Sequence, residues 1–481
     1  MGTTPGRAAV GLALALTLLL GPCGAASAQT PSPTPPATSP PATEPRAAPP
    51  PAAPPPVTAP SASSPAVPGV TRTPLHLTLK EATALAIRQQ PTIRSAQGSL
   101  AAAQARVPEA KAAYYPRFDV QAGVQKSEFK SSTTNERTQS NNTFVQILGR
   151  QLIYDFGKTG ALVDQARADS RVASGELERV REVVVQNVRQ AYFNLLQARR
   201  LTAVADANLS RSELNLRSAQ GFYDVGTKPK SDVTKAEVEV ANARVQVIRA
   251  RNLVRISETT LANALGLEAT VPIEIEDNLN YEPVSLDSAQ LLAEALGNRP
   301  ELRQAQARLD SARAQLSGAR ARYLPDITVN GTAGTSSGDA VISTNGLAGV
   351  SFADNWSIAG QITWNLFEGF FTQSRVKETQ ALIDTARADY ETLELQVRLD
   401  VEQAYITVVE AAERIGATEK AIESARENLR LAQGRYDAGV GTILDLTDAQ
   451  LSLSTAEADN VTALTDYRVG LAVLDRVVGR P

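Results

Sequence analysis

The 481-residue chain is predicted to be mainly helical with a smaller share of strands, and to contain two copies of one unit. Long stretches of the sequence match each other at a fixed offset. A heptad pattern of apolar and small residues runs through each copy, and short segments with a period of two interrupt it. Each copy should therefore form a hairpin of long helices joined to a hairpin of strands.

The N-terminus has the layout of a cleaved secretory signal. Arg7 precedes an apolar run over residues 8–20, and Ala26-Ser27-Ala28 follows, so we assign residues 1–28 to the signal. The run is too short to cross a bilayer as a helix, which needs about 20 residues. In an alternative interpretation Cys23, the only cysteine, is acylated as in a lipoprotein, but the proline before it argues against this.

Residues 29–75 are rich in proline, alanine, serine and threonine. Such a composition cannot bury enough apolar surface to offset the entropy lost on ordering. We expect a disordered, extended linker, and we favour a simple spacer over a segment that binds the cell wall.

The composition excludes several classes of function. The 48 basic and 51 acidic residues nearly balance, and no basic block suggests nucleic-acid binding. His76 is the only histidine, which argues against imidazole ligation of metals and against histidine-based acid–base catalysis. We therefore expect no metal, no cofactor and no catalytic residues, so the protein should not be an enzyme.

The duplication divides the rest of the chain into a first repeat, 76–283, and a second repeat, 284–481. Near the start of each repeat, Pro91 matches Pro300 at an offset of 209. Further along the offset is 213 throughout. The matched pairs include Gln190-Ala191-Tyr192 with Gln403-Ala404-Tyr405, Tyr223-Asp224 with Tyr436-Asp437, Gly226 with Gly439, and Asp232 with Asp445. A gapless register of this length indicates a true internal repeat.

A very long helix is predicted in each repeat. The stretch 157–223 contains no proline, and at about 1.5 Å per residue it would reach on the order of 100 Å. Its seam positions are spaced alternately four and three apart, as are their counterparts in the second repeat. Many are alanine, serine or threonine, so neighbouring helices can approach closely. A long dimeric coiled coil is the alternative at this point.

Strands are predicted between the helices. In the first repeat Phe118, Val120, Ala122 and Val124 alternate with polar residues, whereas the returning segment 144–154 alternates poorly. In the second repeat apolar or small residues alternate over 327–333 and 356–366. Trp356 and Trp364 lie near the two ends of one strand, as in the aromatic girdles of membrane barrels. The polar segments 126–142 and 335–354 would be external loops.

Four strands cannot close a barrel, because the smallest barrels have about eight. An open sheet edge cannot be left in lipid. The barrel must therefore be assembled from several chains, and the strand count alone does not choose three chains over two.

These features together resemble the TolC-like outer-membrane efflux proteins over residues 77–479. The matching motifs are the strand-to-helix segments Ile153-Tyr154-Asp155-Phe156-Gly157 and Leu366-Phe367-Glu368-Gly369, and the tips Tyr223-Asp224-Val225-Gly226-Thr227 and Tyr436-Asp437-Ala438-Gly439-Val440. The resemblance implies a homotrimer with one twelve-stranded β-barrel in the cell outer membrane, in contact with its lipid, and a helical barrel in the periplasm. It also implies two partners, a periplasmic membrane-fusion adaptor and an inner-membrane pump.

The same resemblance implies roles for residues near the hairpin tips. Asp445 and Asp448 would form rings that narrow the periplasmic aperture, and Tyr436 would latch the closed mouth with Asp232. Some members also use an arginine at the position of Gly441, and its absence weakens the case for a doubly latched state. The adaptor would contact both tips at Val225, Gly226, Thr227, Lys228, Ala438, Gly439, Val440 and Gly441.

Simpler interpretations of these acidic residues stay open. Asp232 and Asp445 each follow a glycine turn, where an acidic residue can cap the outgoing helix. Asp448 lies a turn further in, where it could simply face solvent. For the whole chain the predicted function is a passive exit duct for a tripartite efflux or type I secretion system, and the alternative is a periplasmic coiled-coil adaptor or structural stalk. The sequence does not indicate the cargo.

Overall fold

The computed structural model describes residues 75–130, 137–268, 271–339 and 350–480. The predicted signal and most of the predicted linker lie outside these residues. The first repeat holds β1 (Leu75–Leu77), α1 (Leu79–Gln89), α2 (Pro91–Lys111), β2 (Arg117–Lys130), β3 (Arg137–Tyr154), α3 (Lys158–Asp224), α4 (Lys230–Leu265) and β4 (Ile273–Ile275). The second holds α5 (Ser288–Asn298), α6 (Pro300–Ala321), β5 (Asp326–Asp339), β6 (Val350–Thr363), α7 (Phe371–Asp437) and α8 (Ile443–Val478).

The predicted long helices are present as α3 and α7. Each has 67 residues, which corresponds to about 100 Å at 1.5 Å per residue. Helix α3 packs against α2 and α4, and α7 packs against α6 and α8, while α3 also contacts α6 and α8. Each repeat has its own apolar core, with seam residues such as Val188 and Leu195 in the first and Val401 in the second fully buried.

The four long strands form one antiparallel sheet in the order β2-β3-β5-β6. Its register places Val120 opposite Ile147, and Ala333 opposite Trp356. The alternating apolar residues of all four strands therefore share one face. A register shift between Leu152 and Tyr154 adds an unpaired residue near the end of β3. The strand alternates poorly in the sequence because Phe144, Leu148 and Leu152 are apolar although they lie on the face opposite Val145 and Ile147.

The predicted external loops were too wide. Strand pairing continues to Lys130 and resumes at Arg137 in the first hairpin, and it continues to Asp339 and resumes at Val350 in the second. Main-chain hydrogen bonds hold these extensions together although their side chains are mostly polar. Polarity alone therefore misplaced the ends of the strands.

An acidic side chain stabilises the start of α3, where strand passes into helix. The Asp155 carboxylate accepts hydrogen bonds from the Gly157 N–H at 3.1 Å and from the Thr159 N–H at 2.6 Å. In the second repeat Glu368 occupies the matching position and accepts from the Thr372 hydroxyl at 2.8 Å. Asp155 thus satisfies main-chain donors that the helix itself leaves unpaired, whereas Glu368 pairs with a side chain of the first turn of α7.

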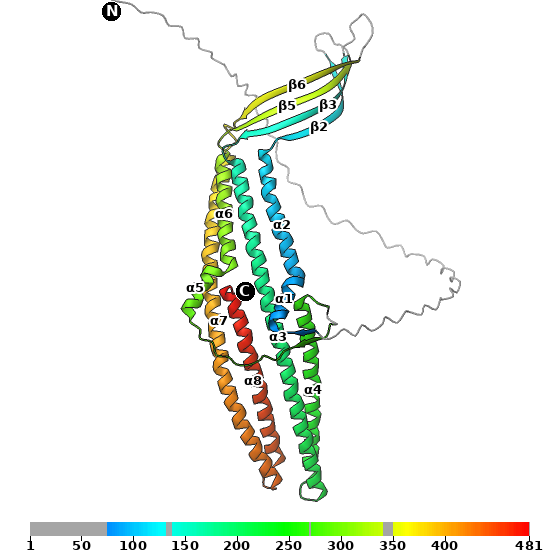
Figure 1. Ribbon diagram of the computed structural model, residues 1–481, viewed down its shortest axis with the longest axis vertical. Coiled ribbons are helices and arrows are strands. Elements are labelled where there is room, and N and C mark those ends of the chain that lie inside the picture. Colours follow the sequence, from blue (N-terminus) through cyan, green and yellow to red (C-terminus); the bar gives the residue numbers. More distant parts are fainter. Residues whose placement is uncertain (1–74, 131–136, 269–270, 340–349, 481) are drawn as a thin grey trace, which may run out of the picture. The chain divides into compact units, whose positions relative to one another are not determined.

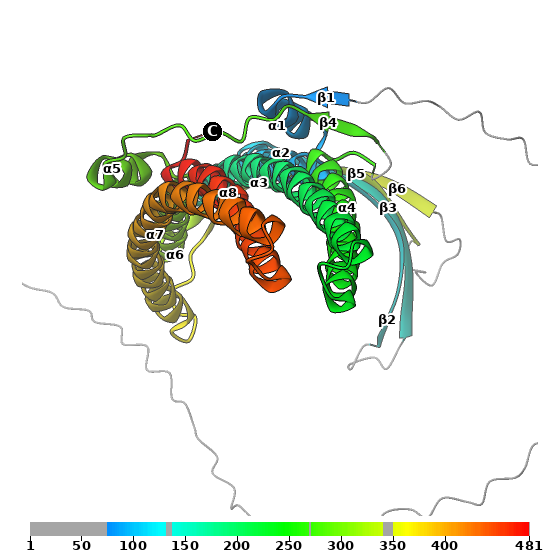
Figure 2. The same cartoon turned by 90° about the horizontal axis from the view of Figure 1, so that it is seen from below.

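Within residues 75–480 the sheet lies at one end of α2, α3, α6 and α7, and the turns α3–α4 and α7–α8 lie at the other end (Figure 1). Viewed along the helices, α7, α8, α3 and α4 follow one another in a curved row (Figure 2). The short elements α1, α5, β1 and β4 lie on the convex side of this row. One chain therefore supplies a curved segment of wall with a sheet above it.

Candidate functional site

The sheet exposes an apolar face that a single chain does not cover. Trp356 is 77% exposed, and Phe118, Val120 and Ile358 are each at least 70% exposed. The other face carries hydrogen-bonded polar pairs between neighbouring strands. These pairs are Gln121–Gln146 at 3.3 Å, Asn330–Gln361 at 3.0 Å and Thr332–Ser357 at 2.8 Å. One face thus suits lipid and the other suits water.

The structure places the two tryptophans differently from the sequence prediction. Trp356 lies in the middle of β6, and Trp364 directly follows the last residue of this strand. The apolar face continues beyond the row of Val120 and Trp356 to Val124, which is 78% exposed. The indole Nε1 of Trp364 donates a hydrogen bond to the Tyr323 carbonyl at 2.9 Å, and the residue is 57% exposed. The tryptophans therefore belong to the exposed apolar surface but do not mark its two borders.

Both outer edges of the sheet are open. In the described residues β2 pairs only with β3, and β6 pairs only with β5. Unpaired main-chain groups cost several kcal/mol each inside a bilayer, so such an edge needs a partner strand there. Because β2 and β6 run in opposite directions, β6 of one copy can pair antiparallel with β2 of the next copy and keep the alternation unbroken.

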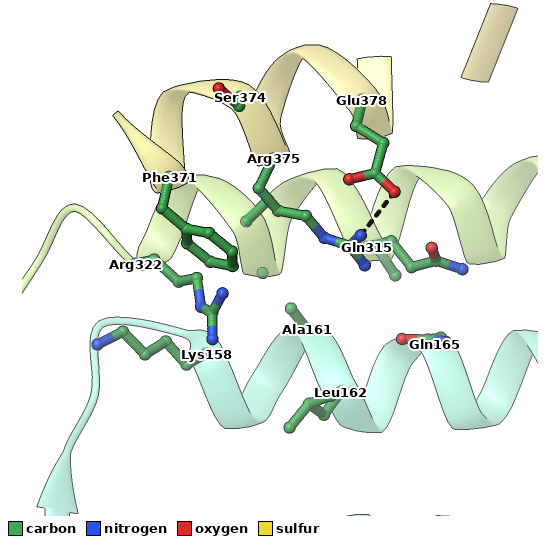
Figure 3. Close-up of a pocket in the computed structure, with 13 residues that line it drawn as sticks. Lys158, Ala161, Leu162, Gln165, Gln315, Arg322, Phe371, Ser374, Arg375 and Glu378 are labelled. Carbon is green, nitrogen blue, oxygen red and sulfur yellow. Dashed lines mark hydrogen bonds and ion pairs between the residues drawn. The ribbon is translucent and has the colours of Figure 1, made fainter. Parts of the chain in front are cut away.

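A groove of about 840 Å³ lies between α3, α6 and α7, next to the sheet (Figure 3). Its cations have partners nearby. The Lys158 ammonium pairs with Asp326 at 2.6 Å, the Arg375 guanidinium pairs with Glu378 at 2.7 Å, and Arg322 lies 5.3 Å from the centre of the Phe371 ring. The Lys158–Asp326 pair joins α3 to the start of β5, and the Arg322–Phe371 contact joins the end of α6 to α7.

The two tips at the far end have nearly the same backbone. Gly226 and Gly439 adopt φ angles of 75° and 76°, a region that glycine enters without strain. The valines beside them are among the most exposed apolar residues, Val225 at 72% and Val440 at 80%. Thr227 and Ala438 are exposed as well. The predicted contact tips therefore present small and apolar side chains to the surroundings.

Asp445 takes part in a capping box at the start of α8. Its Oδ2 accepts from the Thr442 hydroxyl at 2.9 Å and the Thr442 N–H at 3.2 Å, and the Asp445 N–H donates back to the Thr442 hydroxyl at 3.1 Å. These bonds hold the pKa of Asp445 below its usual value. Asp445 and Asp448 are both exposed on the first turns of α8. The capping interpretation thus describes Asp445 in the single chain.

Asp232 occupies the matching position in α4 but does not cap it in this way. The residue before α4 is Pro229, which offers no side-chain hydrogen bond. Among the side-chain hydrogen bonds of the described residues, the Asp232 carboxylate accepts only a long one, at 3.5 Å from the Ser231 hydroxyl. Its charge is therefore available to other groups at the tip.

Tyr436 is fully buried at the tip of the second hairpin. Its ring packs edge to face on Phe222 of the first hairpin, with the ring centres 5.8 Å apart. Within the described residues its hydroxyl has no hydrogen-bond partner. Burial, followed by the charges of Asp232 and Asp437, raises the pKa of this hydroxyl. The charge of Asp232 therefore acts on Tyr436, although no hydrogen bond joins the two residues in the described chain.

Lys228 makes a contact that the sequence did not reveal. Its Nζ donates to the Gly441 carbonyl at 3.1 Å and lies 4.7 Å from the centre of the Tyr436 ring. The side chain thus crosses from the first hairpin to the second. The sequence does show that Lys228 and Gly441 are equivalent positions of the two repeats, which places both at the hairpin tips. It does not show that the lysine side chain is directed toward the second hairpin.

A buried amide network joins α3 and α8 above the tips. The Asn215 amide donates to Gln450 Oε1 at 2.6 Å, and Gln450 Nε2 donates to the Ser212 hydroxyl at 2.9 Å and to Asn208 Oδ1 at 3.2 Å. Ser212, Asn215 and Gln450 are each less than 10% exposed. A network of this kind fixes the register of two helices because only one alignment satisfies every group.

None of the described helices is both long enough and apolar enough to cross a membrane. In the same part of the chain no three His, Cys, Asp or Glu side chains gather as metal ligands would.

An antiparallel sheet with one apolar face and two open edges, joined to long helices in a curved row, defines a subunit of an oligomeric outer-membrane channel. The family description "Outer membrane efflux protein" matches residues 83–267 and 291–480. The chain belongs to this family. It is accordingly an outer-membrane efflux channel, active as a homotrimer with a periplasmic adaptor and an inner-membrane pump.

Individual relatives agree with this assignment. The chain is 24% identical to Outer membrane protein TolC of Escherichia coli over 400 residues, which is 81% of this chain and 79% of that protein. It is 24% identical to Nodulation protein T of Rhizobium leguminosarum over 395 residues, 82% and 83% of the two chains. The solved CmeC outer membrane channel of Campylobacter jejuni has the same fold, with a TM-score of 0.74 and 17% identity over 83% of this chain and 85% of that one.

Proposed function

We propose that the trimer is a passive exit duct, which conducts substrates supplied by the adaptor and pump and does no chemistry on them. The observation that carries this proposal is the sheet, whose apolar face and open edges suit only an assembled barrel in lipid. A periplasmic adaptor or a structural stalk would have no use for strands that expose apolar residues such as Trp356 to their surroundings. Heat-modifiable migration of the protein from an outer-membrane fraction would support the duct, and a soluble periplasmic product would contradict it.

The periplasmic aperture is formed by Asp445 and Asp448. Both carboxylates are exposed on the first two turns of α8, next to the tip where the hairpins of three chains converge in a closed mouth. Six carboxylates at one constriction would attract cations and would be bridged by multivalent ones. Asp445 can line the aperture and cap α8 at the same time, because the capping hydrogen bonds use only its Oδ2.

The latch consists of Tyr436 and Asp232. The two residues are close enough for the Asp232 charge to raise the pKa of the tyrosine, yet the hydroxyl lacks a partner in the described chain. A buried hydroxyl without a partner is unfavourable by about 1–3 kcal/mol. A small movement of the tips that brings Asp232 to this hydroxyl would therefore be favoured, and it would hold the mouth closed.

The adaptor contacts the exposed tips. Val225 and Val440 supply apolar side chains, and the two turns have the same backbone, so one adaptor surface can bind both repeats of a chain in turn. On the N-terminal side of the first repeat, residues 1–28 direct secretion and residues 29–75 act as a linker. The repeat limits 76–283 and 284–481 place one complete hairpin in each half.

The aperture is tested by the double variant Asp445→Asn with Asp448→Asn, studied as purified trimer in planar bilayers. The variant should lose cation selectivity and block by a trivalent cation such as hexamminecobalt added on the periplasmic side. Thr442→Ala is the matched control, because it removes the capping box and keeps both charges. Wild-type selectivity and block in the double variant would show that the aperture lies elsewhere.

A further inference from the structure

The contact between Lys228 and the second hairpin points to a further component of the gate. We propose that Lys228 is a positioning residue, which clasps the turn of the second hairpin and holds the Tyr436 ring in place until the tips part. This inference rests on the proposed function, since it assumes that the tips border the periplasmic mouth. It assigns to Lys228 a role within one chain, in addition to the adaptor contact expected from the sequence.

The geometry makes the ammonium group a link between the repeats. One N–H donates to the Gly441 carbonyl at 3.1 Å, and the charge lies 4.7 Å from the centre of the Tyr436 ring. Hydrogen bonds from a charged donor are stronger than neutral ones, and an aromatic face attracts a cation. Lys228 is also half-buried, so solvent and salt screen these contacts less than they screen those of an exposed lysine.

Gly441 lies in a tightly packed part of the turn. A Cβ on this residue would lie 3.0 Å from Arg435 and from the Tyr436 nitrogen, which is tighter than ordinary packing. The same turn is held by the Gly441 N–H, which donates to the Arg435 carbonyl at 2.9 Å. The carbonyl that receives Lys228 therefore belongs to a compact turn, so that holding this carbonyl holds the whole tip.

An apolar cluster also joins the two tips, in which Phe222 of the first hairpin packs against Tyr436, Ile443 and Leu446 of the second. Among the described residues the next hydrogen bond between the hairpins is Asn215–Gln450, nine residues beyond Gly441, which is about 13 Å at the rise of a helix. Between this hydrogen bond and the tips, the second hairpin can move away from the first only if both the apolar cluster and the Lys228 contact are released. Lys228 is thus placed where one charge affects the position of an entire tip.

The test compares four trimers in planar bilayers without adaptor: wild type, Lys228→Met, Lys228→Arg and Lys230→Met. Methionine keeps most of the alkyl stem and removes the charge, and Lys230 is an exposed lysine on the same tip. We expect Lys228→Met to raise the open fraction about tenfold, equivalent to about 1.4 kcal/mol. Lys228→Arg should restore the wild-type value, and Lys230→Met should leave it unchanged. Trimer melting temperatures should be equal in all four.

Two results would contradict the proposed role of Lys228 in holding the second hairpin. Equal open fractions for Lys228→Met and Lys230→Met would show that only the general charge of the tip matters. Failure of Lys228→Arg to restore closure would show that the lysine acts through packing and not through its charge. If the wild-type trimer formed no pore, the proposed function itself would fail, which is a separate and recognisable outcome.

Discussion

A carboxylate in α3 should make the stability of the protein depend on pH near neutrality. Burial and, next, the nearby Glu301 charge raise the pKa of Glu182 to about 7 from an ordinary 4.5. Arg476, Arg299 and Arg303 act in the opposite direction but do not cancel the effect. Between pH 4.5 and pH 7 Glu182 is protonated in the folded protein but ionised in the unfolded chain. The stability that protonated Glu182 contributes is therefore complete below pH 4.5 and is lost as the pH rises through 7.

The size of the effect follows from the two pKa values. One pKa unit corresponds to about 1.36 kcal/mol, so ionised Glu182 would cost at most about 3.4 kcal/mol per chain. The side chain is only partly buried, and solvent screening lowers this figure. We expect about 1–2 kcal/mol. Glu182→Gln removes the charge and keeps the shape, so it should stabilise the protein by this amount at pH 8 and by little at pH 4.5.

Thermal unfolding of the detergent-solubilised trimer between pH 4.5 and 8 measures this difference. Glu182→Gln should melt higher than wild type at pH 8, by about 1–3 °C, with the curves converging at low pH. Glu176→Gln is an instructive contrast on the same helix, because Arg179 lowers the pKa of Glu176. Removing that carboxylate should destabilise the protein at neutral pH. Parallel pH curves for wild type and Glu182→Gln would refute the reasoning.

Two further predictions concern the tip half of the molecule. Gln450→Leu leaves the buried Asn215 amide without an acceptor and should destabilise each chain by about 1–3 kcal/mol, whereas Asn215→Leu with Gln450→Leu should recover much of this loss; additive losses in thermal unfolding would contradict a coupled network. Tyr436→Phe keeps the ring contacts and deletes the hydroxyl, so it should weaken closure by about 0.5–1.5 kcal/mol. In bilayer recordings Asp232→Asn should raise the open fraction little further when Tyr436→Phe is already present. Additive effects of the two substitutions would show that the two residues do not act as one latch.

The sequence by itself determined the architecture. The 213-residue offset defined the duplication, and the proline-free heptads predicted α3 and α7 because a seam repeated over so many turns fits only a long packed helix. Alternation predicted the apolar face of the sheet, and the strand count required several chains because lipid cannot satisfy an open edge. These inferences succeeded because each depends on the order of the residues alone: on matches between the two repeats, or on periodicity within one helix or strand.

The tertiary structure alone decided how distant side chains meet. The ends of the strands were misplaced, because backbone pairing continues through polar residues such as Ser127 and Thr138. Tyr436 of the second hairpin is buried against Phe222 of the first. Lys228 reaches Gly441 across 213 positions of sequence. Such contacts depend on how two hairpins pack against each other, and no local pattern in either hairpin encodes that packing.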